Sequence, residues 1–254
     1  MTDAVVVSGG ASGIGLAVAK HFHQQSAHVV VLGRRADRLE KAAEHLNRSG
    51  GVPVLPIAVD LTQADQVQRV CDEITHRHKE IRVLVAAAGG NVVLTSPPGS
   101  YGPDLSGIAR RWTENFASNV LSAVLLIEGL RRHLSAPGGR IILISSIAAY
   151  RGSGNGCYGA AKAALHPYCY DLGAELGPKG ITVNVVAPGY IAETEFFGDR
   201  LSPERREMLI GQTMNRRAGL PSDIASTIGW LASREAGHIT GQIVQVNGGA
   251  ERGR

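Results

Sequence analysis

Tyr158 and Lys162 are the most chemically informative pair in the sequence, because they stand four residues apart at the start of a long segment of helical character. Residues at this spacing share one face of a helix. An unperturbed phenol has a pKa of about 10, too high for ready proton transfer at neutral pH. A neighbouring ammonium favours the phenolate and lowers that pKa. The pair therefore indicates a tyrosine that acts as a general acid and base.

Ser146 adds a hydroxyl at the right place, directly after the apolar run that begins at Arg140. A serine hydroxyl can hydrogen-bond a carbonyl oxygen and hold the carbonyl carbon in place for hydride attack. Tyrosine, lysine and serine together indicate a site that interconverts a carbonyl and an alcohol.

A glycine-rich turn, residues 8–15, follows the first apolar run and reads Ser-Gly-Gly-Ala-Ser-Gly-Ile-Gly. Glycines let the backbone turn tightly and approach a pyrophosphate, and the N-terminus of the following helix favours an anion. We expect this turn to bind a dinucleotide, with a purely structural turn as the alternative.

Arg34 and Arg35 end the second apolar run, where an acidic residue would bind the ribose hydroxyl of NAD. A guanidinium instead suits a 2′-phosphate. We therefore expect NADP as the cofactor, with a solvated arginine pair as the alternative. Asp60, just past the third apolar run, is placed to touch the adenine amino group.

Short apolar runs alternate with longer helical stretches along the whole chain, which predicts parallel strands joined by helical crossovers. The predicted strands are Ala4–Val7, His28–Leu32, Val54–Val59, Val83–Ala87, Arg140–Ser145, Thr182–Val186 and Gln242–Val246. The clearest predicted helices are Asp37–Asn47, Gln63–His78, Ala117–Leu134 and Cys157–Leu176. No linker divides the pattern. We expect an α/β fold: one doubly wound Rossmann domain over residues 1–254, a seven-stranded parallel sheet with helices on both faces.

Two connections are longer than usual, near residues 90–111 and 189–212, and both follow the carboxyl ends of strands, where ligands bind in such sheets. They carry Tyr101, Tyr190, Phe196 and Phe197. These aromatic residues suggest either the apolar wall of a substrate pocket or the packing of a lid.

Composition excludes several classes of protein. The net charge is +4, but the basic residues come as separated pairs without interleaved aromatic residues, so we expect no nucleic-acid binding. The three cysteines form no CxxC pair and have no histidine at metal-ligand spacing, so we expect no metal site and a reducing compartment. No apolar stretch is long enough to cross a bilayer, and the first residues lack the charge of a signal peptide. We expect a cytoplasmic protein.

The motifs, in this order, resemble those of the short-chain dehydrogenase/reductase family, and the resemblance runs from Ala4 to Gly249. The motifs are the turn Ser8–Gly15, Asn119, Ser146, Tyr158-x-x-x-Lys162, Asn184–Val186 with Pro188-Gly189, and the ending Thr240-Gly241-Gln242…Asn247-Gly248-Gly249.

The resemblance implies a role for each residue of the catalytic set. Tyr158 would be the general acid and base. Lys162 would bind the nicotinamide ribose and lower the pKa of the tyrosine. Ser146 would orient the carbonyl, and Asn119 would hold a water that links Lys162 to solvent. The residues expected to contact the cofactor are Ser8, Gly9, Ser12, Gly13, Ile14, Gly15, Arg34, Arg35, Asp60, Leu61, Ala88, Gly89, Tyr158, Lys162, Pro188, Gly189, Ile191 and Thr194.

One assignment stays open between two serines. The usual interval in the family points to Ser145, which lies thirteen residues before Tyr158, whereas the local pattern Ser-Ile-Ala-Ala favours Ser146. We choose Ser146.

The resemblance further implies an NADP-dependent ketone reductase or alcohol dehydrogenase, similar to general carbonyl reductases or to 3-oxoacyl-carrier-protein reductases, that works as a dimer or tetramer. Its substrate would be a small carbonyl or alcohol, with an acyl-linked ketone as one option. The alternatives are a regulator that senses NADP without turnover and an NAD-dependent alcohol, sugar or steroid dehydrogenase of the same fold.

Overall fold

A seven-stranded parallel sheet forms the centre of the protein, a computed structural model that describes residues 4–154 and 156–252. The strands are β1 (Ala4–Ser8), β2 (His28–Gly33), β3 (Leu55–Ala58), β4 (Ile81–Ala86), β5 (Arg140–Ile144), β6 (Thr182–Pro188) and β7 (Ile243–Val246). They lie in the order β3-β2-β1-β4-β5-β6-β7, and every neighbouring pair is parallel. The predicted fold class is confirmed.

The sheet is buried on both faces because its strands are runs of Val, Ile and Leu. The chain enters at β1, builds outward to β3, and then crosses back to β4 on the other side of β1. The order of strands reverses there, so a crevice opens at the carboxyl ends of β1 and β4. The glycine turn and the predicted catalytic residues lie around this crevice.

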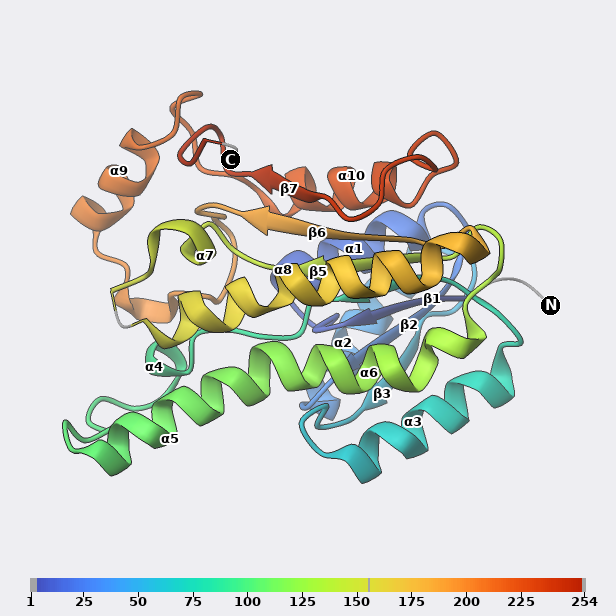
Figure 1. The fold of residues 1–254 in the computed structure, drawn as a ribbon, viewed down its shortest axis with the longest axis horizontal. Coiled ribbons are helices and arrows are strands. Elements are labelled where there is room, and N and C mark those ends of the chain that lie inside the picture. Colours follow the sequence, from blue (N-terminus) through green and yellow to red (C-terminus); the bar gives the residue numbers. More distant parts are fainter. Residues whose placement is uncertain (1–3, 155, 253–254) are drawn as a thin grey trace.

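Helices cover both faces of the sheet (Figure 1). One hydrophobic cluster joins the sheet to α1 (Gly13–His23), α2 (Ala36–Asn47) and α10 (Pro221–Leu231). The other joins it to α3 (Ala64–Arg77), α6 (Ser122–Leu130) and α8 (Cys157–Leu176). The remaining α-helices are α4 (Val92–Thr95), α5 (Leu105–Phe116), α7 (Ala148–Arg151) and α9 (Pro203–Gly211).

The first predicted loop and the helix after it differ from the prediction. Residues 105–111, expected in the loop, belong to α5, which begins after Asp104 because that side chain accepts a hydrogen bond from the Gly107 N–H at 3.2 Å. α5 runs into a π-helical turn at Ala117–Leu121 and then into α6. The second loop also carries a helix, α9.

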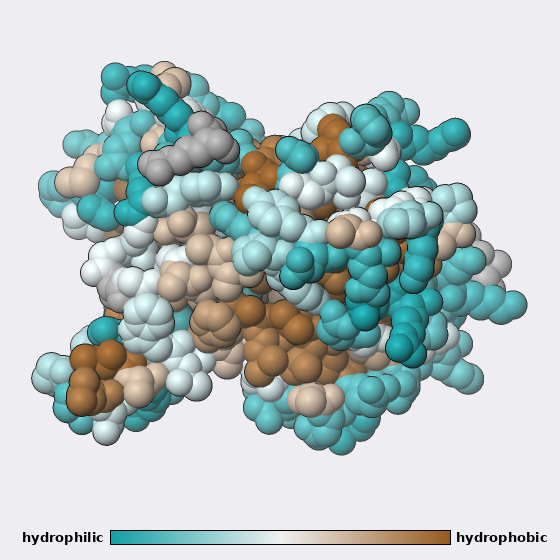
Figure 2. All heavy atoms as spheres, viewed as in Figure 1, coloured by the Kyte–Doolittle hydropathy of each residue, from teal (hydrophilic) through white to brown (hydrophobic). Residues whose placement is uncertain are grey.

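α8 has the bounds that the sequence predicts and stays one helix through Pro167. Tyr158 and Lys162 therefore share its buried face. Figure 2 views the side of the molecule that α8 and α6 cover, and a hydrophobic area gathers there. Within the described residues, none of the helices combines the length and the apolar character that crossing a membrane requires.

Candidate active site

A cleft of about 1160 Å³ opens at the carboxyl ends of the strands and collects most of the predicted site. Of the predicted residues, the following line it: Gly9, Ser12, Gly13, Ile14, Gly15, Arg34, Arg35, Asp60, Leu61, Ala88, Gly89, Ser146, Tyr158, Lys162, Pro188, Gly189, Ile191 and Thr194. The cleft thus joins the glycine turn, the end of β2 and the start of α8.

The glycines of the turn let backbone segments pack closely against each other. A Cβ on Gly15 would collide with the carbonyl oxygen of Gly9, and a Cβ on Gly9 would lie 3.0 Å from the backbone of Ala87. Gly13, at the start of α1, has a φ of 51°. The turn therefore leaves the N-terminus of α1 open to the cleft, a cradle that suits the pyrophosphate of a dinucleotide.

Ser8 does not line the cleft. It is buried, accepts a hydrogen bond from the Ala88 N–H at 2.9 Å, and lies 3.5 Å from the carbonyl oxygen of Val85, to which it donates. Its hydroxyl therefore joins β1 to the segment after β4. This contact holds the two sides of the crevice together.

Tyr158 is buried at the inner end of the cleft, 6% exposed, with Ser146 hydrogen-bonded to its phenol. Burial raises the pKa of Tyr158 to about 12, and the Ser146 hydrogen bond opposes that rise. Ser146 is itself held by the Ala148 N–H, which donates to its hydroxyl at 3.1 Å. At neutral pH the phenol carries its proton.

Lys162 lies one turn further along α8, with its Nζ 5.9 Å from the centre of the Tyr158 ring. The ammonium donates to the carbonyl oxygen of Ile144 at 2.8 Å, and burial lowers its pKa to about 8. The sequence predicts that this ammonium lowers the pKa of the tyrosine, whereas burial is the largest influence on Tyr158 in the structure and raises its pKa.

The two candidate serines point to different neighbours. Ser146 contacts Tyr158, whereas Ser145 is 2% exposed and donates to the Lys162 carbonyl oxygen at 2.9 Å. His166 Nε2 lies 2.9 Å from the same hydroxyl. Because that hydroxyl already donates its proton, His166 is the donor in the second bond. Ser145 thus fastens α8 to the end of β5.

Asn119 does not line the cleft and lies behind its wall, in the π-helical turn. Its amide donates to the Gly90 carbonyl oxygen at 2.8 Å and accepts from the Gly90 N–H at 3.0 Å. A Cβ on Gly89 would lie 2.6 Å from Asn119 Oδ1 and 3.2 Å from Lys162 Nζ. Glycine at 89 therefore leaves room for Asn119 and Lys162 where a side chain would otherwise stand.

Arginines occupy the far end of the cleft, at the end of β2. Arg34 is exposed, lines the cleft and makes no ion pair within residues 4–154 and 156–252. Arg35 lies 3.5 Å from a carboxylate oxygen of Glu195. Arg38, in the first turn of α2, reaches both oxygens of the same carboxylate at 2.5 Å.

Comparison with known proteins agrees with this geometry. A family model described as "Enoyl-(Acyl carrier protein) reductase" matches residues 9–251. A 3-oxoacyl-[acyl-carrier-protein] reductase of Chlamydia trachomatis is 33% identical over 252 residues, which cover 96% of this chain and 95% of that protein. The chain belongs to the short-chain dehydrogenase/reductase family.

Other family members match over similar lengths. Dehydrogenase/reductase SDR family member 4 of Mus musculus is 30% identical over 96% of this chain and 85% of its own. A short-chain type dehydrogenase/reductase structure from Mycobacterium ulcerans superposes with a TM-score of 0.86 at 29% identity, covering 98% of this chain and 89% of that one. A 3-oxoacyl-[acyl-carrier protein] reductase with bound NAD from Brucella melitensis gives a TM-score of 0.84, also at 29% identity, covering 97% and 90%.

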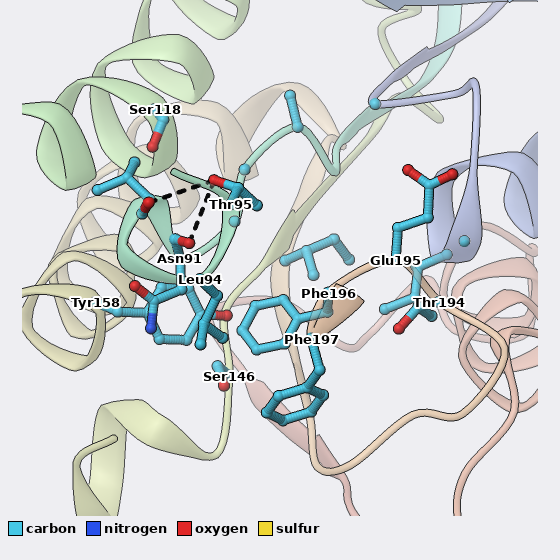
Figure 3. Close-up of a pocket in the computed structure, with 18 of the residues that line it drawn as sticks. Asn91, Leu94, Thr95, Ser118, Ser146, Tyr158, Thr194, Glu195, Phe196 and Phe197 are labelled. Carbon is cyan, nitrogen blue, oxygen red and sulfur yellow. Dashed lines mark hydrogen bonds between the residues drawn. The ribbon is translucent and has the colours of Figure 1, made fainter. Parts of the chain in front are cut away.

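In this short-chain dehydrogenase/reductase the segment Thr194–Arg200 crosses the cleft (Figure 3). Thr194 lies over Gly13 of the glycine turn, and Phe196 packs on Tyr158 with 5.4 Å between ring centres. Arg200 donates to the carbonyl oxygens of Val93 and Ser96 in the other long loop. The segment, here named the strap, therefore contacts the glycine turn, Tyr158 and the other long loop.

Sequence reasoning did not find three residues that hold the site together: Arg38, Glu195 and Arg200. Arg38 could have been found, because it follows Arg35 by three residues on one face of α2. Glu195 and Arg200 contact partners more than a hundred residues away, and no local pattern marks them. The sequence left two interpretations for the aromatic residues of this loop, a pocket wall and the packing of a lid. Phe196 fits both, because its ring packs on Tyr158 in the cleft and on Phe197 within the loop.

Proposed function

We propose that this protein is an NADP(H)-dependent oxidoreductase that interconverts a ketone and a secondary alcohol, with Tyr158 as the general acid and base. The observation that carries the proposal is the buried Tyr158 phenol, hydrogen-bonded to Ser146 at the inner end of the cleft that begins at the glycine turn. A proton donor and a dinucleotide cradle in one cleft are what hydride transfer to a carbonyl requires.

The chain's own residues would handle the proton and the orientation of the substrate. The cofactor, when bound, supplies the hydride for reduction or accepts it in oxidation. Ser146 would hold the carbonyl oxygen beside the phenol. Tyr158 would donate its proton to that oxygen in reduction and take it back in oxidation, and the raised pKa keeps the phenol protonated at neutral pH. Lys162, whose pKa of about 8 leaves it mostly charged at pH 7, would stabilise the phenolate that forms.

A preference for NADP over NAD is supported by the arginines at the end of β2. Arg34 and Arg35 line the cleft where the adenosine ribose is expected, and Arg38 adds a third guanidinium. Guanidinium groups bind a phosphate dianion by charge-assisted hydrogen bonds, which a ribose hydroxyl cannot match. Asp60 and Leu61 line the cleft nearby, where the adenine would lie.

An acyl-linked ketone is the substrate class that we favour. The names of the relatives support it, since several are 3-oxoacyl-[acyl-carrier-protein] reductases. The cleft continues past Tyr158 toward Arg151, Arg205 and Gln212, so it has room for a substrate beyond the cofactor.

We also propose that the protein works as a homo-oligomer through the face formed by α5 and α8. Large side chains there are exposed: Trp112 at 41%, Phe116 at 44% and Tyr170 at 49%. Monomeric proteins rarely leave extended apolar areas in water, so a second copy is a suitable cover.

A ketone panel tests the proposed function. Purified protein is incubated with NADPH or NADH and a series of 3-oxoacyl thioesters and simple ketones, and the absorbance of the reduced cofactor is followed. We expect turnover with NADPH and less with NADH, and we expect Arg34→Asp to reverse that order. Binding of NADPH without turnover across the whole panel would favour a nucleotide sensor, and a wild-type preference for NADH would contradict the role of the arginines.

A further inference from the structure

Glu195 holds the strap to the arginine end of the cleft. Its carboxylate accepts two hydrogen bonds from Arg38 at 2.5 Å and lies 3.5 Å from Arg35. The partners come from opposite sides of the cleft, because α2 follows β2 whereas the strap follows β6. These contacts lower the pKa of Glu195, with the Arg38 hydrogen bond as the largest cause, so the carboxylate is charged at neutral pH.

One of these guanidiniums, Arg35, is also where a 2′-phosphate is expected to bind. Arg35 and Glu195 both line the cleft, and Arg38 follows Arg35, in the first turn of α2. A carboxylate and a phosphate take the same donors from a guanidinium. Glu195 therefore takes guanidinium donors that a phosphate at this end of the cleft would use.

We propose that Glu195 is a specificity-determining residue that competes with the 2′-phosphate of NADP for Arg35 and Arg38. This inference rests on the proposed function, since it assumes that a nicotinamide dinucleotide occupies the cleft. NAD carries a hydroxyl in place of the phosphate and does not require the two arginines, so Glu195 leaves its affinity unchanged. Glu195 thereby reduces the ratio of the affinity for NADP to the affinity for NAD.

The solvent exposure of the Arg38–Glu195 ion pair limits how much it can weaken NADP binding. The side chains of Arg38 and Glu195 are 38% and 58% exposed. Exposed ion pairs contribute up to about 1 kcal/mol, which corresponds to about fivefold in a dissociation constant. Removal of the carboxylate should therefore tighten NADP⁺ binding by about fivefold and leave NAD⁺ binding within about twofold.

Equilibrium binding experiments measure the effect of Glu195 on nucleotide affinity and do not require turnover. Dissociation constants of NADP⁺, NAD⁺, adenosine 2′,5′-bisphosphate and 5′-AMP are determined by calorimetry at one fixed ionic strength for the wild type and Glu195→Gln. The two adenosine fragments lack the nicotinamide, so they report on the arginine end and not on the contact between Phe196 and Tyr158. We expect Glu195→Gln to tighten NADP⁺ and the bisphosphate, and to leave NAD⁺ and 5′-AMP unchanged.

Two further variants separate competition from general effects. Glu193→Gln removes the same charge from an exposed position two residues earlier and should change no dissociation constant. In an Arg38→Gln background, the gain from Glu195→Gln should shrink, because the main partner of the carboxylate is gone.

The other outcomes overturn the inference. An unchanged or weaker affinity for NADP⁺ in Glu195→Gln would refute competition. Equal tightening of NADP⁺ and NAD⁺ would assign the effect to the position of the strap and not to the phosphate. If neither dinucleotide binds to the wild type or to the variant, the proposed function fails, and the inference fails with it.

Discussion

The buried ammonium of Lys162 should make the stability of this protein depend on pH in a characteristic way. Burial lowers the pKa of Lys162 from an ordinary 10.5 to about 8. Between these values the unfolded chain keeps the proton and the folded chain has lost it. Stability rises with pH wherever the unfolded state binds more protons, so the Lys162 contribution to the free energy of unfolding should increase from pH 8 to pH 10.5.

The pKa difference sets the size of the increase, because each pKa unit corresponds to about 1.4 kcal/mol. The full difference corresponds to about 3 kcal/mol. Urea unfolding of the wild type and Lys162→Met is followed by circular dichroism from pH 7 to pH 10. All other groups titrate in both proteins, so the difference between the two curves isolates Lys162.

The free energy of unfolding of the wild type, relative to that of Lys162→Met, should increase as the pH rises. Lys20→Met, which removes an exposed ammonium from α1, serves as a control and should run parallel to the wild type. Parallel curves for the wild type and Lys162→Met would refute the lowered pKa of Lys162.

Two other predictions concern the serine pair and the glycine turn. Ser146→Ala should lower turnover by about tenfold or more, because it removes the hydrogen bond to the Tyr158 phenol. Ser145→Ala should mainly lower the free energy of unfolding, by about 1 kcal/mol, because it leaves His166 without its hydrogen-bond partner. Steady-state rates and urea unfolding separate them, and the opposite ranking would move the catalytic role to Ser145. Gly15→Ala should abolish dinucleotide binding in a fluorescence titration because its Cβ meets the Gly9 carbonyl oxygen, and wild-type affinity would contradict the cradle.

The sheet could be predicted from the sequence because its signals are local. Runs of Val, Ile and Leu mark strands that are buried on both faces, and most predicted bounds differ from the observed ones by one or two residues. α8 was equally clear, because Gly156 precedes it and a helical pattern continues to Leu176. The π-helical turn that holds Asn119 has no comparable signal, so the sequence predicts a regular helix there.

Contacts that join distant segments could not be predicted. Nothing near Glu195 indicates that it meets Arg38, which lies 157 residues earlier. The environment of Lys162 depends on how β5 ends, because its ammonium donates to the Ile144 carbonyl oxygen and lies over the Tyr158 ring. The sequence therefore indicates the candidate catalytic residue types, but the direction of the pKa shift of Tyr158 depends on burial, which only the folded structure determines.

The central claim is that Tyr158 moves the proton while the cofactor carries the hydride, and Tyr158→Phe tests it most directly. This variant keeps the ring that packs on Phe196 and removes only the hydroxyl. NADPH affinity should stay within about twofold of the wild type, since the cradle is intact, and turnover of the best ketone should fall by about 100-fold to 10,000-fold. If Tyr158→Phe binds NADPH and reduces the ketone at the wild-type rate, the account is contradicted.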